Sequence, residues 1–157
     1  GLKYQHLMCP NGIICHSYGP FPARRHDAAM YGESELEALI SQVFRPNGER
    51  LIIYGDGGYP QREFMFVPFQ GAQLTPAEEL FNTMMSNVRT SVEWGFAKVC
   101  NNWAFIHYWA NQKILLQPLG KYFQVATLLS NCHTCLYGSQ VSQYFNVTPP
   151  TLEEYLA

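Results

Sequence analysis

Charged residues are scarce in this chain, and neither sign is in clear excess. Lys and Arg number 10 against 12 Asp and Glu, charged residues make up 14% of the sequence, and the formal net charge is -2. A module that holds nucleic-acid phosphates unaided is expected to be basic. The composition therefore argues against binding to nucleic acid through charge alone. We expect any strong DNA binding to come from outside this chain.

Long apolar runs and repeats are missing too. No apolar run approaches the roughly 20 residues that span a bilayer, so we expect a soluble intracellular protein with no membrane partner. The chain shows no repeats, low-complexity tracts or interior linkers. Its 157 residues are 47% hydrophobic and 15% aromatic, enough for one substantial core. We predict one domain over residues 1–148 and a C-terminal tail over residues 149–157.

The five cysteines are odd in number, which favours reduced core thiols over a disulfide framework. Cys132 and Cys135 form a CxxC pair with His133 between them and His107 upstream, which raises a zinc site as an alternative. A structural zinc ion needs four well-placed ligands, and no second CxxC or HxxxH pair exists here. A plain helical core segment is the favoured interpretation.

The first 22 residues predict a β-hairpin. Residues 2–9 and 13–18 are strand-like and are separated by Pro10-Asn11-Gly12, a tight-turn sequence. Gly19-Pro20-Phe21-Pro22 then ends the second strand, and residues 23–31 are expected to form a loop. Because a hairpin seldom begins the core of a sheet and Gly1 leads straight into a strand, we expect an earlier strand to be missing.

The middle of the chain predicts a helix and two short strands. Ser34 is a candidate N-cap for a helix over residues 35–44. Residues 51–54 are almost wholly apolar, which is typical of a strand buried on both faces, and Asp56 follows at its carboxyl end. Residues 64–67 predict an edge strand or extended loop, because Pro68 follows.

The strongest helix signal begins at Thr75, with proline at the first helical position and Glu78 completing a capping box. We predict a helix to about residue 101. Four of its polar side chains fall on a narrow stripe beside the apolar face: Asn82, Ser86, Arg89 and Glu93. Residues 103–109 are ambiguous between helix and strand, and a last helix is predicted over residues 118–137.

Three acidic residues, Asp27, Asp56 and Glu93, are candidate metal ligands. Phosphodiester cleavage with two divalent ions needs three or four carboxylates at one point, because Mg²⁺ and Mn²⁺ prefer hard oxygen ligands. Spacing alone leaves plainer alternatives open. Asp56 in Gly-Asp-Gly-Gly is equally typical of a turn, and Glu93 is placed to pair with Arg89 on the same helix.

Several separated motifs give this chain a family resemblance. They are Gly1-Leu2-Lys3-Tyr4-Gln5, Pro10-Asn11-Gly12-Ile13-Ile14, Gly19-Pro20, Arg25-His26-Asp27-Ala28, Gly55-Asp56-Gly57-Gly58-Tyr59-Pro60, Pro68-Phe69, Phe81-Asn82, Arg89 with Glu93, and Pro149-Pro150-Thr151. Present in this order over nearly the whole chain, they resemble the Harbinger/PIF-type DDE transposase family and the nucleases derived from it. The resemblance implies a ribonuclease-H-like α/β fold with a mixed central sheet and flanking helices.

The same resemblance implies two divalent ions, Mg²⁺ or Mn²⁺, that activate water or a DNA 3′ hydroxyl for attack on a phosphodiester. Carried over by position, Asp56 matches the second catalytic aspartate and Glu93 the catalytic glutamate, while Asp27 matches an additional, metal-binding aspartate. The family's first catalytic aspartate would precede Gly1. We therefore expect the first strand and one metal ligand to be missing, and the chain alone not to be a competent nuclease.

Other residues are expected to support this site. Arg89 is expected to orient Glu93 or to neutralise part of the site, with an ordinary helix salt bridge as the plainer alternative. Asn82 and Ser86 are candidates to hydrogen-bond near the metals, and a structural role fits them as well. Tyr59 and Trp94 are expected to pack.

The segment around Asp27 carries three more candidates. Arg24 and Arg25 are candidates to contact a DNA backbone, with a solvated loop pair as the equal alternative. His26 is a supporting candidate beside Asp27. The His26-Asp27 pair also occurs in helical metal phosphohydrolases, but the predicted hairpin argues against that class.

The leading hypothesis is therefore a metal-dependent DNA endonuclease or transposase catalytic domain in a eukaryotic nucleus, with possible exchange to the cytoplasm. DNA is the expected partner, and a separate DNA-binding protein is a candidate second partner. The alternative is a domesticated, non-catalytic module that binds DNA or chromatin proteins. Retention of Asp56 together with Glu93 favours an enzyme ancestry.

Overall fold

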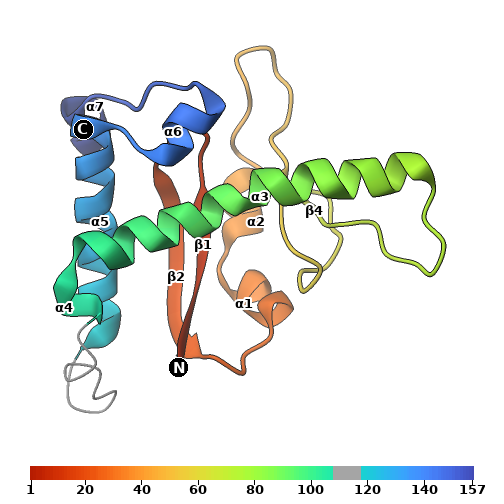
Figure 1. Ribbon diagram of the computed structural model, residues 1–157, viewed down its shortest axis with the longest axis horizontal. Coiled ribbons are helices and arrows are strands. Elements are labelled where there is room, and N and C mark those ends of the chain that lie inside the picture. The colour runs from red at the N-terminus through yellow and green to blue at the C-terminus, as the bar shows by residue number, and fades with distance from the viewer. Residues whose placement is uncertain (108–117) are drawn as a thin grey trace. The chain divides into compact units, whose positions relative to one another are not determined.

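The computed structural model describes residues 1–107 and 118–157, which contain both helices and strands (Figure 1). Their order is β1 (Leu2–Met8), β2 (Ile14–Pro22), α1 (Asp27–Glu33), α2 (Leu36–Ile40), β3 (Ile53–Tyr54), β4 (Met65–Phe66), α3 (Pro76–Asn102), α4 (Ala104–His107), α5 (Leu119–Tyr137), α6 (Gln140–Phe145) and α7 (Leu152–Leu156). The chain divides into two compact units. The first contains residues 1–5 and 21–90, and the second contains residues 6–20 and 91–157.

The predicted hairpin is confirmed, because β1 and β2 are neighbours in a two-stranded sheet (Figure 1). Two backbone hydrogen bonds close its turn, from Cys9 N to Ile13 O and from Gly12 N to Cys9 O, both 2.9 Å. The turn needs glycine at position 12, since φ there is 86°, a left-handed conformation that side chains disfavour.

A second two-stranded sheet lies in the first unit, where β3 and β4 run parallel with Ile53 opposite Met65. The α/β class is therefore shown, but the described residues form two separate sheets rather than the single mixed sheet we expected. The strand predicted over residues 51–54 is also shorter than expected. The segment is also not buried on both faces as expected, because Ile53 is buried whereas Ile52, just before the strand, is 63% exposed.

Residues 23–31 were expected to form a loop, but α1 begins within them at Asp27. A negative charge in the first helical turn is favoured by the helix dipole, which explains the start. The helix expected over residues 35–44 is reduced to α2, and Ser34 does not cap it in the ordinary way. Its hydroxyl accepts only a long hydrogen bond from Leu36 N (3.4 Å), and it also accepts from Gln5 Nε2 (3.1 Å) and donates to the carbonyl of Tyr31 (2.9 Å).

The long helix α3 is confirmed, together with the capping box that predicted its start. Glu78 Oε2 accepts from Thr75 N at 2.7 Å, and Glu78 N donates to Thr75 Oγ1 at 3.3 Å. The backbone bond from Thr75 is the main reason that the pKa of the Glu78 carboxyl is lowered.

In the second unit, α5 confirms the last predicted helix. The ambiguous segment over residues 103–109 is helical at α4, and residues 108 and 109 fall outside the described part of the chain. Two short helices were missed, α6 and α7, the latter inside the predicted tail. Each starts with a capping box, led by Ser139 in α6 and by Thr151 in α7, so the Thr-x-x-Glu sequence of residues 151–154 was a signal for α7.

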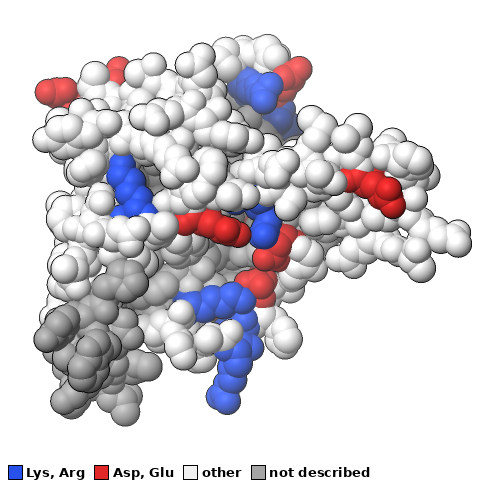
Figure 2. Space-filling model, viewed as in Figure 1, with Lys and Arg blue, Asp and Glu red and all other residues white. Residues whose placement is uncertain are grey.

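All five cysteines are free thiols, but none is buried: Cys15 is exposed and the other four are half-buried, so they are not the core thiols that the sequence predicted. Among the described helices none is both long and apolar enough to cross a bilayer. Charged side chains are sparse on the face drawn in Figure 2, which is mostly uncharged.

A buried asparagine ties the start of β2 to α5 and α7. Asn131 is 3% exposed, and its Oδ1 accepts from Ile14 N at 3.0 Å while its Nδ2 donates to Ile14 O at 2.9 Å. The same amide donates to the Tyr155 hydroxyl at 2.9 Å. Since Ile14 is itself buried, no solvent would replace these bonds.

Replacing that asparagine is expected to destabilise the protein. Asn131→Leu keeps the side-chain size but leaves the backbone N–H and C=O of Ile14 without partners, so the free energy of unfolding should fall by about 2–5 kcal/mol. Urea unfolding followed by circular dichroism measures it. Asn101→Leu, at an exposed asparagine of α3, should change it by less than about 0.5 kcal/mol. Equal effects of the two substitutions would contradict the role given to Asn131.

His6 gives the second unit a dependence on pH. Its ring stacks on Phe96 with centroids 4.1 Å apart, and Phe123 lies 5.4 Å away. Burial is the main cause that lowers the pKa of His6 from 6.5 to about 4, and the nearby His16 lowers it further. The folded protein therefore holds His6 neutral at a pH where the unfolded chain protonates it.

Stability should accordingly be lost as the pH falls from 6.5 towards 4, the interval between the unfolded and folded pKa values of His6. The shift corresponds to at most about 3 kcal/mol. His6→Phe should remove this component, so that unfolding free energies measured at pH 7 and pH 4.5 differ less in the variant than in the unmodified protein. An equal loss in both proteins would show that His6 is not the cause.

Candidate functional site

The turn after β3 presents the Asp56 carboxylate. Asp56 Oδ1 accepts a hydrogen bond from Gly58 N at 2.8 Å, and its carbonyl accepts from Tyr59 N at 3.1 Å. Asp56 therefore does act as a turn residue, as its surroundings in the sequence allowed. Its side chain remains 43% exposed, so the carboxylate is accessible as well as structural.

The structure brings Asp27 to the same turn. A side chain at position 58 would begin 2.9 Å from Asp27 Oδ2 and 3.0 Å from Asp56 Oδ1, which means that both oxygens border the space left open by Gly58. The two oxygens are consequently at most about 6 Å apart. Asp27 comes from the first turn of α1 and Asp56 from the end of β3, so only the tertiary fold makes them neighbours.

The other oxygen of each aspartate forms an ion pair with a basic side chain. Lys3 Nζ lies 2.7 Å from Asp27 Oδ1, and Arg89 Nη1 lies 3.3 Å from Asp56 Oδ2. The role expected of Arg89, neutralising part of the site, thus fits its contact with Asp56. Lys3 was not singled out as a site residue, although it lies in one of the motifs that carried the family resemblance. Each cation holds its carboxylate so that the second oxygen faces Gly58.

Tyr59 is electrostatically coupled to the aspartate pair. Burial is the first cause that raises the pKa of its hydroxyl, and the charges of Asp27 and Asp56 raise it further, while Arg89 lowers it. Its ring also packs edge-on against Tyr31, with centroids 6.2 Å apart. Packing was the role expected of Tyr59, and its closeness to the carboxylates is additional.

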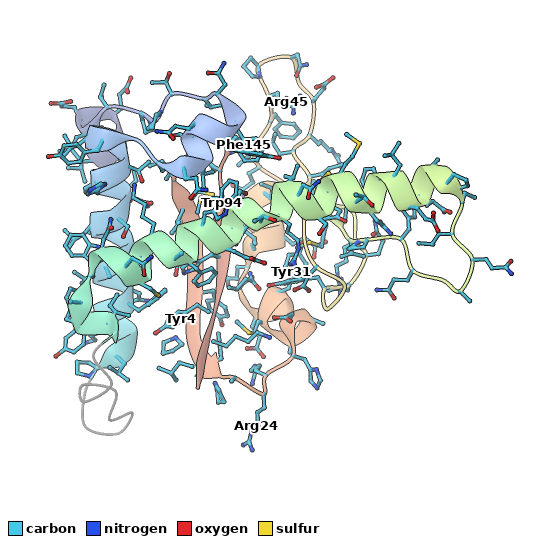
Figure 3. The ribbon with its side chains drawn as sticks, in the orientation of Figure 1. Tyr4, Arg24, Tyr31, Arg45, Trp94 and Phe145 are labelled. Carbon is cyan, nitrogen blue, oxygen red and sulfur yellow. The ribbon has the colours of Figure 1, made fainter. Side chains whose placement is uncertain are left out.

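Glu93 lies one helical turn after Arg89 on α3 and is exposed. It belongs to the second unit, whereas Asp27 and Asp56 belong to the first. Trp94 also belongs to the second unit and packs edge-on against Tyr144 at 5.4 Å, as expected of a packing residue (Figure 3).

The aspartate pair suits a divalent cation in ligand type. Its two near oxygens are hard donors, and Mg²⁺ commonly takes one or two protein carboxylates and completes its shell with water and phosphate oxygens. The described residues contain no group of three or more acidic, histidine or cysteine side chains arranged to hold a metal. The site therefore offers two ligands rather than the full set of the sequence hypothesis. The zinc alternative at Cys132 and Cys135 gains no support in the same part of the chain.

The Asn82 side chain bonds to the backbone of Phe69 rather than to one of the site carboxylates. Its Oδ1 accepts from Phe69 N and its Nδ2 donates to Phe69 O, both at 3.0 Å. Asn82 therefore fastens the main chain of Phe69 to α3, which is the structural role that the sequence had left open for it. Two motifs of the resemblance, Pro68-Phe69 and Phe81-Asn82, are joined by this contact.

The basic candidates near α1 differ from one another. Arg25 forms an ion pair with Glu33, and its guanidinium lies 5.3 Å from the centre of the Phe21 ring. Arg24 is exposed and extends away from the ribbon (Figure 3). His26 occupies the N-cap position of α1 and is exposed, without a side-chain capping bond. Of the two arginines, Arg24 is the one more open to a phosphate.

Comparison with known proteins gives one finding about ancestry. The search of curated proteins found no match, and neither did the search of solved structures. A family model described as DDE superfamily endonuclease matches residues 1–131, which include Asp27, Asp56, Arg89 and Glu93. Membership of that family suggests a transposase-type nuclease function. Since the match covers most of the sequence, this chain belongs to the DDE superfamily endonuclease family.

Proposed function

We propose that the chain carries the catalytic core of a divalent-metal-dependent DNA endonuclease or transposase, which hydrolyses or transfers phosphodiester bonds. The observation that carries this proposal is the meeting of Asp27 and Asp56 at Gly58, with one oxygen of each turned to the same space. Membership of the DDE endonuclease family supports the reaction class. Glu93 is proposed as the further acidic ligand, from its position in the family pattern.

The proposed roles follow from the contacts. Asp27 and Asp56 would bind Mg²⁺ or Mn²⁺ through the oxygens beside Gly58. When bound, such an ion supplies Lewis-acid activation of the phosphate and lowers the pKa of an attacking water. Lys3 and Arg89 hold the opposite oxygens, which orients the carboxylates and offsets their repulsion when no ion is present. Gly58 is needed because any side chain would intrude between the two ligands.

Four finer assignments belong to the same proposal. The motif set favours the Harbinger/PIF-type branch of the family, with its ribonuclease-H-like arrangement. A net charge of -2 favours a separate DNA-binding protein as a partner, because the chain has little charge with which to hold DNA. A transposase-derived nuclease of this kind would act in the nucleus. Because Arg24 is exposed, we propose that it contacts the phosphate backbone of DNA.

A second function, a non-catalytic module that binds DNA or chromatin proteins, is favoured by one observation. Asp27 already has a cation at 2.7 Å and Asp56 has one at 3.3 Å, so the carboxylates are balanced without a metal. A domesticated protein that had lost cleavage would retain the turn for its structural value. Metal binding separates the two functions.

Manganese titration of the full chain by calorimetry tests the proposal. Asp56→Asn keeps an oxygen for Gly58 N but removes the charge, so we expect it to weaken Mn²⁺ binding at least about tenfold, as Asp27→Asn and Glu93→Gln should. Glu79→Gln, at an exposed carboxylate of α3, should leave the affinity unchanged. Affinities unaffected by all three site substitutions would rule out the proposed metal-dependent enzyme.

A second test uses the steric requirement at position 58. Gly58→Ala would place a methyl group 2.9 Å and 3.0 Å from the two carboxylate oxygens, which must move apart, so Mn²⁺ affinity should fall while unfolding free energy changes little. The matched control is Gly32→Ala on α1, where an added Cβ meets nothing within 4 Å. If Gly58→Ala binds Mn²⁺ like Gly32→Ala, the oxygens beside Gly58 are not the ligands.

A further inference from the structure

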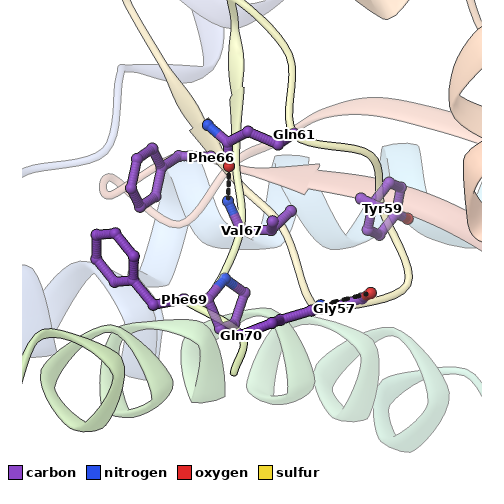
Figure 4. A pocket seen from close by; sticks show the side chains of 8 residues that line it. Gly57, Tyr59, Gln61, Phe66, Val67, Phe69 and Gln70 are labelled. Atoms are coloured by element: carbon purple, nitrogen blue, oxygen red, sulfur yellow. Dashed lines mark hydrogen bonds between the residues drawn. The ribbon is translucent and has the colours of Figure 1, made fainter. Parts of the chain in front are cut away.

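A groove of about 530 Å³ opens beside the Asp56 turn, within the first unit (Figure 4). Its lining comes from residues 57–70 and begins with Gly57, the residue directly after Asp56. The volume lies within the range of about 300–1,000 Å³ that is usual for small-molecule sites. None of the lining residues carries a charge, which disfavours a phosphate and favours a neutral ligand.

One wall of the groove is a braced aromatic surface. Phe66 and Phe69 meet edge-on with centroids 5.5 Å apart, and Phe81 of α3 contacts both, at 5.4 and 5.5 Å. Phe69 nevertheless remains 37% exposed. An exposed ring held by two others offers a rigid face for stacking, with little conformational entropy to lose on binding.

Asn82 fixes this aromatic face in place. Its paired hydrogen bonds to the N–H and C=O of Phe69, both 3.0 Å, satisfy a backbone segment that follows Pro68 and lies outside any strand. A side chain that satisfies both groups of one residue holds that residue's position more tightly than a single bond would. These paired hydrogen bonds therefore explain how the ring of Phe69, a loop residue, can serve as a binding surface.

Two glutamine side chains of the groove offer one hydrogen-bond donor and one acceptor. Gln61 Oε1 accepts from Val67 N at 3.2 Å, which leaves its Nε2 as a donor, while Gln70 Nε2 donates to Gly57 O at 3.4 Å, which leaves its Oε1 as an acceptor (Figure 4). A neutral ring with both donors and acceptors on its edge matches this arrangement, and nucleobases have that character.

We propose that this groove binds one unpaired nucleobase of a DNA strand, stacked on Phe69 and hydrogen-bonded by Gln61 and Gln70. The identity of the ligand rests on the proposed function, because the groove begins at the residue after a carboxylate assigned to the phosphate-cleaving site. Base stacking is tolerant of sequence, since every base has a π-face. The groove would thus hold a nucleotide next to the reacting phosphate without reading the sequence.

Fluorescence anisotropy on the full chain tests the inference. The probes are a labelled single-stranded dT 12-mer and an abasic oligomer of the same length, both in Ca²⁺. The base-bearing strand should bind at least about fivefold more tightly, the effect of one stacked base. Phe69→Ala and Asn82→Ala should abolish this preference, and Phe69→Trp should retain it. Phe44→Ala, at another exposed phenylalanine of the first unit, should keep it unchanged.

The outcomes distinguish this inference from the function on which it rests. Equal binding of the two strands by the unmodified protein, or no binding of either, would overturn the groove as a base site whatever the Mn²⁺ titration shows. So would a preference that survives Phe69→Ala in a protein whose circular dichroism is unchanged. A preference lost in Phe69→Ala while its Mn²⁺ affinity is retained supports the groove, and loss of Mn²⁺ binding in Asp56→Asn bears only on the metal site.

Discussion

Repulsion between Asp27 and Asp56 is the constraint around which the first unit is arranged. Two carboxylate oxygens at most about 6 Å apart repel each other, by about 3 kcal/mol for a 6 Å separation at an effective dielectric near 20 and by less where solvent screens them. Lys3 lies 2.7 Å from one of these carboxylates and Arg89 lies 3.3 Å from the other, and the two cations offset this cost. The start of β1 and the middle of α3 are thereby tied to the turn after β3.

Each unit also uses an asparagine to fasten a stretch of backbone to a helix. Asn82 bonds both polar groups of Phe69 from α3, and Asn131 does the same for Ile14 from α5. Both residues have few other backbone partners, because Phe69 lies outside any strand and Ile14 begins a strand of a two-stranded sheet. An amide side chain suits this purpose because it carries a donor and an acceptor with the spacing of a strand edge.

Together these features divide the chemistry of the first unit between two neighbouring surfaces. The pair at Gly58 is acidic and flanked by cations, which suits metal and phosphate, and the groove beside it is neutral and aromatic, which suits a base. Such a division agrees with the low charge of the chain as a whole. A protein of this kind would engage DNA locally at the reaction site and depend on a partner for long-range attraction.

The sequence by itself determined the elements whose signals are local. The hairpin turn, the start of α3 at Thr75 and the position of Asp56 after an apolar strand all depend on neighbouring residues, and the family motifs identified the superfamily. Only the tertiary structure decided that Asp27 reaches Asp56, that Lys3 and Arg89 balance them and that Asn82 supports Phe69. Those contacts join residues far apart in the chain, and neither residue spacing nor helical periodicity contains that information. The same reason explains why the sequence did not predict the hydrogen bond from Gln5 to Ser34, since the two residues are distant in sequence.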